Sequence, residues 1–140
     1  MNQIEPRHET EVERIISLVA HQVNHRNTFL FRLLSERPIR ELRLAIDLFK
    51  ALQYKDAVAQ FVQLLSRNIS PDYCHMVMCY IARAYAHMGL LHSAESVFDE
   101  ARKIPLPQHY LATSVSIEDE TRKDISLCRS RFPSEDIPAA

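Results

Sequence analysis

Glycine is almost absent from this sequence, because Gly89 is the only one among 140 residues. Proteins rich in β-hairpins and tight loops need glycine wherever the backbone takes a positive φ. The shortage therefore argues against a β-rich fold and favours an all-α one. It also excludes a glycine-rich phosphate-binding loop, which needs several glycines within a few residues.

Cysteines and long apolar runs are also scarce. The three cysteines, Cys74, Cys79 and Cys128, are odd in number and lack a framework spacing, which favours free thiols in a reducing compartment. No apolar run approaches the roughly 20 residues of a membrane helix, and the polar N-terminus does not resemble a secretory signal. We therefore expect a cytoplasmic protein that has no membrane segment.

Neither sign of charge dominates the chain. The 17 basic and 18 acidic residues leave a formal net charge of −1, and no long run carries one sign. A nucleic acid or an anionic membrane surface is recognised through concentrated positive charge. The sequence therefore predicts neither as a partner.

Residues suited to metal binding or catalysis do not form a known motif. His21 and His25 have the i, i+4 spacing of a helical metal site, but no third ligand is adjacent. Cys74, His75 and Cys79 match no standard zinc spacing. We therefore expect no metal, no cofactor and no catalytic residue, so that the chain is not an enzyme.

The most informative stretch runs from Met78 to Ala101 and predicts two short helices joined by a turn at Gly89. Two alanines are small enough for the helix backbones to approach closely, and two rings fill the space beside them: Ala82, Ala94, Tyr85 and Phe98. Pro105 and Pro107 then stop the second helix. An earlier segment repeats the pattern: Ala45, Ala57 and Phe61 each lie 37 residues before their counterparts (82 − 45, 94 − 57 and 98 − 61). Leu52 stands where the second copy has its glycine.

These residues resemble the signature of the tetratricopeptide repeat (TPR), a helix–turn–helix unit of about 34 residues. The matched positions are Ala45, Tyr54, Ala57, Phe61, Ala82, Tyr85, Gly89, Ala94, Phe98 and Ala101. The resemblance implies an all-α fold, a TPR-like stack of antiparallel helical hairpins in a single domain over residues 1–140. We expect a degenerate hairpin at 8–37, repeats at 38–71 and 75–108, a capping helix at 116–132 and a disordered tail at 133–140.

The expected starts of the first and last helices depend on capping signals. Thr10 with Glu13 has the capping-box spacing, which predicts a polar lead over residues 1–9 and a helix from there. A second short helix is expected over residues 28–35. Ser116 with Asp119 has the same capping-box spacing, which predicts the start of the C-terminal helix.

In stacked repeats the first helix of each pair lines a concave surface. The resemblance maps the partner-binding positions of that surface onto Val12, Ile16, Val19, Ile39, Leu42, Ile46, Phe49, Met76, Cys79, Arg83 and His87. Such an apolar groove suits an amphipathic helix of another protein. Ile16 and Ile46 stand where a TPR that clamps a peptide carboxylate needs polar side chains, so a clamp is not expected. The alternative is that these residues pack against the chain's own N-terminal or C-terminal helix.

The expected function is therefore a non-enzymatic protein–protein interaction module that holds an amphipathic helix or extended segment. The size and layout also resemble the small cytoplasmic TPR chaperones of bacterial type III secretion, which hold needle or translocator subunits. That resemblance implies a secretion substrate as partner, with a small co-chaperone. The alternative is a constitutive scaffold subunit whose groove is an oligomer interface, and the oligomeric state stays open.

Overall fold

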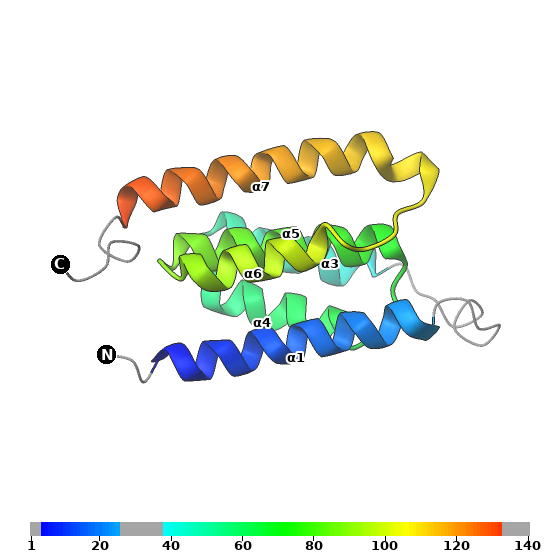
Figure 1. Cartoon of the computed structure of the whole chain (residues 1–140), viewed down its shortest axis with the longest axis horizontal. Helices are drawn as coiled ribbons and strands as arrows, with labels where there is room; N and C mark the ends of the chain where they lie inside the picture. The colour runs from blue at the N-terminus through cyan, green and yellow to red at the C-terminus, as the bar shows by residue number, and fades with distance from the viewer. Residues whose placement is uncertain (1–3, 26–37, 133–140) are drawn as a thin grey trace.

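The computed structural model describes residues 4–25 and 38–132, and these ranges are all-α (Figure 1). The described α-helices are α1 (Ile4–His25), α3 (Ile39–Lys50), α4 (Tyr54–Leu65), α5 (Pro71–His87), α6 (Leu91–Ala101) and α7 (Leu111–Arg131). A short 3-10 turn, η1 (Gln108–Tyr110), leads into α7. Within the described ranges, none of the helices has the length and apolar content needed to cross a bilayer.

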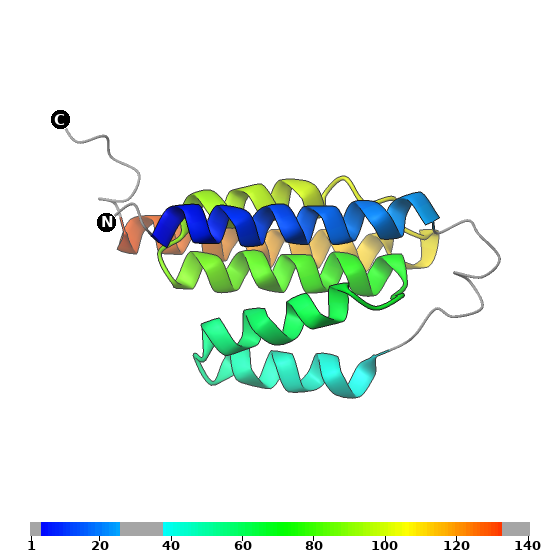
Figure 2. The same cartoon turned by 90° about the horizontal axis from the view of Figure 1, so that it is seen from below.

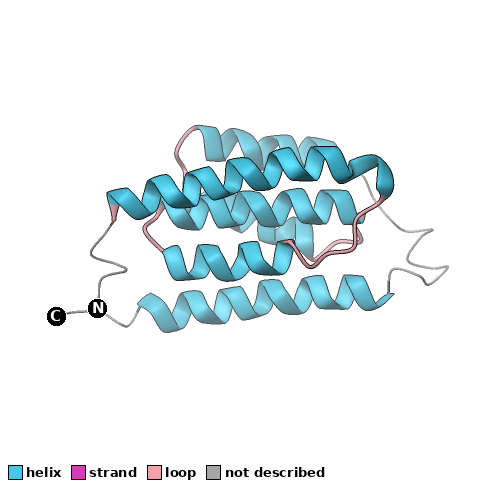
Figure 3. Ribbon diagram, turned by 45° about the horizontal axis from the view of Figure 1, so that its top comes forward, coloured by secondary structure: helices cyan, strands magenta, loops and turns pink. Residues whose placement is uncertain are grey.

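Helix α5 lies at the centre of the molecule and packs against α3, α4, α6 and α7. Figures 1 and 2 show α3, α5 and α7 running in one direction and α1, α4 and α6 in the other, so that successive described helices are antiparallel. Helix α7 covers one side of the α5/α6 pair, while α1 lies on the opposite side against α6 and α4. Short loops join α3 to α4 and α5 to α6 (Figure 3). Because α5 is surrounded, ten of its side chains are buried, which explains why its sequence is apolar on more than one face.

The two hairpins α3/α4 and α5/α6 turn in the same way. Gly89 has a φ of +80°, and Leu52, its counterpart 37 residues earlier (89 − 52), has a φ of +65°. In each turn a backbone N–H reaches the carbonyl five residues back: Leu90 to Tyr85 and Gln53 to Leu48, both at 2.9 Å. This is the Schellman arrangement, in which one residue in the left-handed region ends the helix.

Leu52→Gly should stabilise the protein by about 1 kcal/mol, because the left-handed conformation strains a residue with a Cβ. The Leu52 side chain is 71% exposed, so its removal loses little packing. The matched change Gly89→Ala should destabilise by about 1–2 kcal/mol through the same strain. Chemical denaturation of both variants measures the two effects, and a Leu52→Gly variant less stable than the parent would contradict this account of the turn.

Helix α7 packs on the α5/α6 hairpin, mainly on α5, and helix α5 packs on the α3/α4 hairpin, mainly on α4. Leu42 and Phe49 of α3 are buried, on the helix pair that α5 covers. Their counterparts on α5, Cys79 and Ala86, are also buried, on the helix pair that α7 covers. The correspondence continues on the packing faces. Val77 and Ala84 of α5 are buried, and Ser114 and Thr121 of α7 are buried 37 residues later (114 − 77 and 121 − 84).

The expected start of the C-terminal helix at Ser116 is wrong, because α7 already begins at Leu111. Ser116 is exposed inside the helix and caps nothing. The buried face of α7 includes Ser114 and Thr121, whose hydroxyls donate to the carbonyls of Leu111 (2.6 Å) and Ile117 (2.7 Å) in the same helix. Because these buried positions carry hydroxyl groups rather than apolar side chains, they interrupt the apolar stripe of α7. A search for apolar residues at helical spacing therefore misses the beginning of this helix.

The expected N-terminal boundary is also wrong, because α1 begins at Ile4, before the predicted cap Thr10. The apolar spacing after Thr10 is correct, since Val12, Ile15 and Val19 belong to the core. The second helix expected at 28–35 and the tail expected at 133–140 lie outside the described residues. An all-α fold with antiparallel neighbouring helices is confirmed.

Candidate functional site

Nine of the ten residues of the repeat signature lie in the interior or at its turns. Seven are completely buried, Phe98 is 5% exposed and Gly89 forms the turn; the seven are Ala45, Ala57, Phe61, Ala82, Tyr85, Ala94 and Ala101. Tyr54 is partly buried and stacks on His87 with ring centroids 4.9 Å apart. These residues hold the helices together, so the candidate site lies elsewhere.

The expected partner-binding residues fall into two groups that the structure does not bring together. Val12 and Val19 of α1 are buried, and Ile16 is partly buried, on the helix that packs against α6 and α4. The other residues lie on α3 and α5. Three of these, Leu42, Phe49 and Cys79, are also buried.

The remaining expected residues keep part of their surface open. Ile39 is 52% exposed, and Ile46, Met76, Arg83 and His87 are partly exposed. Sequence reasoning missed residues on the same side of these helices: Tyr80 between Met76 and Arg83, and Ile117, Glu120 and Asp124 on α7. We call the surface formed by Ile39, Ile46, Met76, Tyr80, Arg83 and Glu120 the α3–α5–α7 face.

Arg83 is the charged centre of this face. Its guanidinium lies 4.9 Å from the ring centroid of Phe49 and 5.3 Å from that of Tyr80. Its Nε donates to a carboxylate oxygen of Asp124 at 2.6 Å, and Glu120 lies 3.8 Å from its Nη1. Arginine combines aromatic stacking with carboxylate pairing in this way because its guanidinium is planar and weakly hydrated.

Aromatic rings continue the cluster below Arg83. Phe49 meets the rings of Tyr54, Tyr80 and His87 edge-on, with centroids 5.3–5.9 Å apart. His87 also lies 3.3 Å from Asp124. Aromatic pairs at these distances are worth about 0.5–1.5 kcal/mol beyond area burial. These ring contacts hold the side chains beneath the α3–α5–α7 face in fixed positions.

A signal for the missed α7 residues exists in the sequence. Glu120 and Asp124 follow Arg83 and His87 by 37 residues (120 − 83 and 124 − 87). The offset goes unnoticed because α7 lacks the alanine and aromatic signature of the earlier helices. At the counterparts of Ala82 and Tyr85 it has Asp119 and Arg122.

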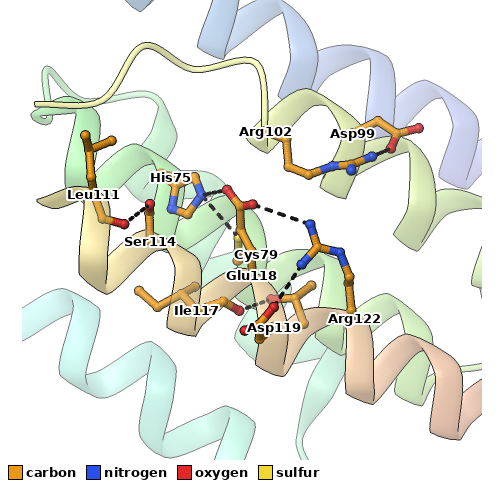
Figure 4. A network of polar contacts seen from close by, with 11 residues as sticks. His75, Cys79, Asp99, Arg102, Leu111, Ser114, Ile117, Glu118, Asp119 and Arg122 are labelled. Carbon is orange, nitrogen blue, oxygen red and sulfur yellow. Dashed lines mark hydrogen bonds and ion pairs between the residues drawn. The ribbon is translucent and has the colours of Figure 1, made fainter.

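A second polar cluster joins α5 to α7 in the interior (Figure 4). The completely buried His75 places Nδ1 2.9 Å from the Tyr110 hydroxyl and Nε2 2.8 Å from a Glu118 carboxylate oxygen. Cys79 Sγ lies 3.9 Å from the same Nε2. Glu118 is itself 3.7 Å from Arg122.

Cysteine, histidine and glutamate here do not form a catalytic triad. In a triad the nucleophile and the orienting carboxylate contact opposite ring nitrogens, whereas Cys79 and Glu118 both approach Nε2. Burial raises the pKa of the Cys79 thiol to about 12, so the thiolate is scarce at neutral pH. The cluster instead satisfies buried polar atoms between α5 and α7.

All three thiols should resist modification in the native protein. Cys74, Cys79 and Cys128 are buried, and burial raises the pKa of Cys128 as well. We expect them to react with Ellman's reagent at pH 8 at least about a hundredfold more slowly than after denaturation. Absorbance of the released thiolate measures this, with guanidinium-denatured protein as the control. A thiol that reacts in the native state as fast as free cysteine would contradict the packing of α7 on α5.

Within the described residues, no three potential ligands converge on a metal-sized space. His21 is exposed, and the side chain of His25, four residues later, lies outside the described part of the chain. The described residues form a surface, the α3–α5–α7 face, that has apolar, cationic and acidic parts and packs on a cluster of aromatic side chains. Comparisons with protein-family models, with curated proteins and with solved structures find no match to this chain.

Proposed function

We propose that the protein is a non-enzymatic, TPR-like binding module whose α3–α5–α7 face holds an amphipathic segment of another protein. One observation carries this proposal: open positions recur at 37-residue intervals on three helices that run in the same direction. Ile39, Met76 and Thr113 form one such series, and Ile46, Arg83 and Glu120 form the next. A surface built from repeated rows of side chains suits an elongated ligand.

The TPR identity is supported by two features besides the signature residues. Both turns use the left-handed residue and the hydrogen bonds expected of one repeated unit. The three buried positions of α3 are buried again at their counterparts on α5, and α7 follows the second hairpin with no described helix after it. Its outward positions Asp119 and Lys123 are exposed, as a polar capping helix requires.

The chemistry of the face suggests how a partner helix would be oriented. On α3 the open apolar residues Ile39 and Ile46 lie beside the exposed cations Arg43 and Lys50. On α7 the residues that meet Arg83 are acidic: Asp124, and Glu120 with a 67% exposed side chain. A partner helix would place apolar residues over Ile39, Ile46 and Met76, acidic residues towards α3 and basic residues towards α7.

We extend the proposal to a cytoplasmic chaperone of the type III secretion kind. In that role the face would cover the polymerising segment of a needle or translocator subunit, together with a small co-chaperone. The antiparallel helical hairpins and the open apolar residues of the α3–α5–α7 face support this assignment. The physical task would be to shield an apolar helix until export.

The alternative is a constitutive scaffold subunit, and exposed apolar residues at the two ends of the stack favour it. Leu44 on the outer side of α3 is 54% exposed, and Val115 and Leu127 on α7 are 60% and 49% exposed. A copy of the chain stacked on either end would cover them.

Partner capture by surface variants tests the proposal. Ile46→Asp and Met76→Asp should lose a protein that the parent chain retrieves from its native lysate, because each places a charge against the partner's apolar side. Leu52→Asp, on the exposed turn, is the matched control and should retain it. Circular dichroism checks that each variant stays folded. Retention of every partner by both face variants would overturn the proposal.

Light scattering separates the two candidate functions. A binding module is expected to be monomeric alone and to form a defined complex with its partner. A scaffold is expected to remain an oligomer at low concentration and to dissociate when Leu44 and Leu127 are replaced by Asp.

A further inference from the structure

One side of α3 alternates apolar and basic side chains along the edge of the α3–α5–α7 face. Ile39, Arg43, Ile46 and Lys50 follow one another at intervals of four, three and four residues, which places them on one side of the helix. Ile39, Arg43 and Lys50 are exposed, and Ile46 is partly buried. We call these four residues the α3 stripe. It offers both apolar area and positive charge to the solvent.

The basic side chains that α5 places on the same face already contact carboxylates of the chain. Arg83 meets Asp124 at 2.6 Å and Glu120 at 3.8 Å, and His87 lies 3.3 Å from Asp124. Both carboxylates belong to α7, at the positions 37 residues after the two α5 residues. Helix α7 therefore supplies the negative charge that α5 requires.

Helix α5 supplies no such carboxylates to the α3 stripe. The residues 37 positions after Ile46 and Lys50 are Arg83 and His87 (83 − 46 and 87 − 50), and neither is acidic. Within the described ranges, neither Lys50 nor Arg43 forms an ion pair with a carboxylate. The positive charge of the stripe is thus left for a molecule outside the described structure to neutralise.

The acidic residues of α3 itself do not change this balance. Glu41 lies 3.6 Å from Arg67, away from the stripe. Asp47 is exposed and is the one remaining carboxylate of the helix, against the two cations of the stripe. The apolar residues between the cations favour an amphipathic ligand over a uniformly charged one.

Building on the function proposed above, we propose that the segment held by the α3–α5–α7 face is an acidic amphipathic helix with two carboxylates seven residues apart. These carboxylates would pair with Arg43 and Lys50, which are also seven residues apart, or about 10 Å along a helix. An apolar residue three or four positions after the first carboxylate would cover Ile46. The two cations would then determine which amphipathic helices the face accepts.

Two synthetic peptides are the probes. The acidic peptide carries glutamates seven residues apart, leucines three and four residues after the first glutamate, and alanine and glutamine elsewhere. The basic peptide is identical except that lysines replace the glutamates. Fluorescence anisotropy of the labelled peptides with the full chain should show saturable binding of the acidic peptide that weakens with added salt, and at least about tenfold weaker binding of the basic peptide.

Charge reversal on the chain is the decisive variant. Arg43→Glu/Lys50→Glu should reverse the preference, so that the basic peptide binds more tightly than the acidic one. Arg40→Glu/Lys55→Glu, an equal charge change at exposed positions outside the stripe, is the matched control and should keep the parent's preference. Circular dichroism checks that both variants stay folded. Equal binding of the two peptides, no saturable binding of the acidic one, or a preference that the reversal leaves unchanged would overturn the inference.

Capture from the native lysate separates this inference from the function on which it rests. A partner that Ile46→Asp loses should also be lost by Arg43→Glu/Lys50→Glu. A partner that only Ile46→Asp loses would overturn the acidic assignment and leave the binding face in place. A partner that both variants retain would count against the face itself. Self-association of the parent chain that the charge reversal abolishes would overturn the inference by assigning the stripe to a second copy.

Discussion

Phe49→Asp is expected to destabilise the protein by about 3–5 kcal/mol, enough to unfold a domain of ordinary stability. Phe49 is 8% exposed and contacts the rings of Tyr54, Tyr80 and His87 as well as the Arg83 guanidinium. The substitution removes this packing and places a carboxylate in a buried site, beside an Arg83 guanidinium that is already paired with Asp124. Urea denaturation followed by circular dichroism measures the loss.

Ile46→Asp, one helical turn earlier on α3, is the matched control. Ile46 is only partly buried, so its replacement should cost much less stability and act mainly on partner binding. If Phe49→Asp were as stable as Ile46→Asp, Phe49 would belong to the open surface, as the sequence pattern suggested, and not to the core.

His75→Ala is expected to destabilise the protein by about 2–4 kcal/mol, because it opens a cavity and breaks two hydrogen bonds at once. The imidazole is completely buried and links α5 to Tyr110 and Glu118, which belong to η1 and α7. The buried hydroxyl of Tyr110 would lose its partner. Thermal denaturation measures the total effect, and hydrogen exchange should show α7 opening before the other helices.

His92→Ala is the control for this substitution, since His92 is exposed on α6. Its loss should change stability by no more than about 0.5 kcal/mol. Equal effects of the two substitutions would show that His75 does not join α7 to α5. A His75→Ala variant in which all helices open together would contradict only the order of opening.

The hairpins α3/α4 and α5/α6 could be predicted because their determinants are local. Gly89 permits the left-handed turn, and alanines such as Ala82 and Ala94 mark close helix contacts within a few residues of that turn. Leu52 shows the limit of this reasoning. Its side chain gives no sign of a positive φ, and only the 37-residue offset to Gly89 indicates one.

The candidate surface was only partly predictable, because exposure depends on what packs on each helix. Leu42 and Cys79 have the spacing of open positions, yet α5 packs on α3 and α7 packs on α5, and both side chains are buried. The pocket that Phe98 and Arg129 line between α6 and α7 could not be foreseen, since these residues are 31 positions apart (129 − 98) and meet only through the packing of α7.

The sequence by itself determined an all-α chain, the two central hairpins and the residues at their close contacts, because helix periodicity, small residues and turn residues act over short distances. The tertiary structure alone decided that α1 lies against α4 and α6, that α7 covers α5, and hence which side chains remain exposed. Those outcomes depend on burying apolar area between distant segments, and many packings of the same amphipathic helices bury similar area.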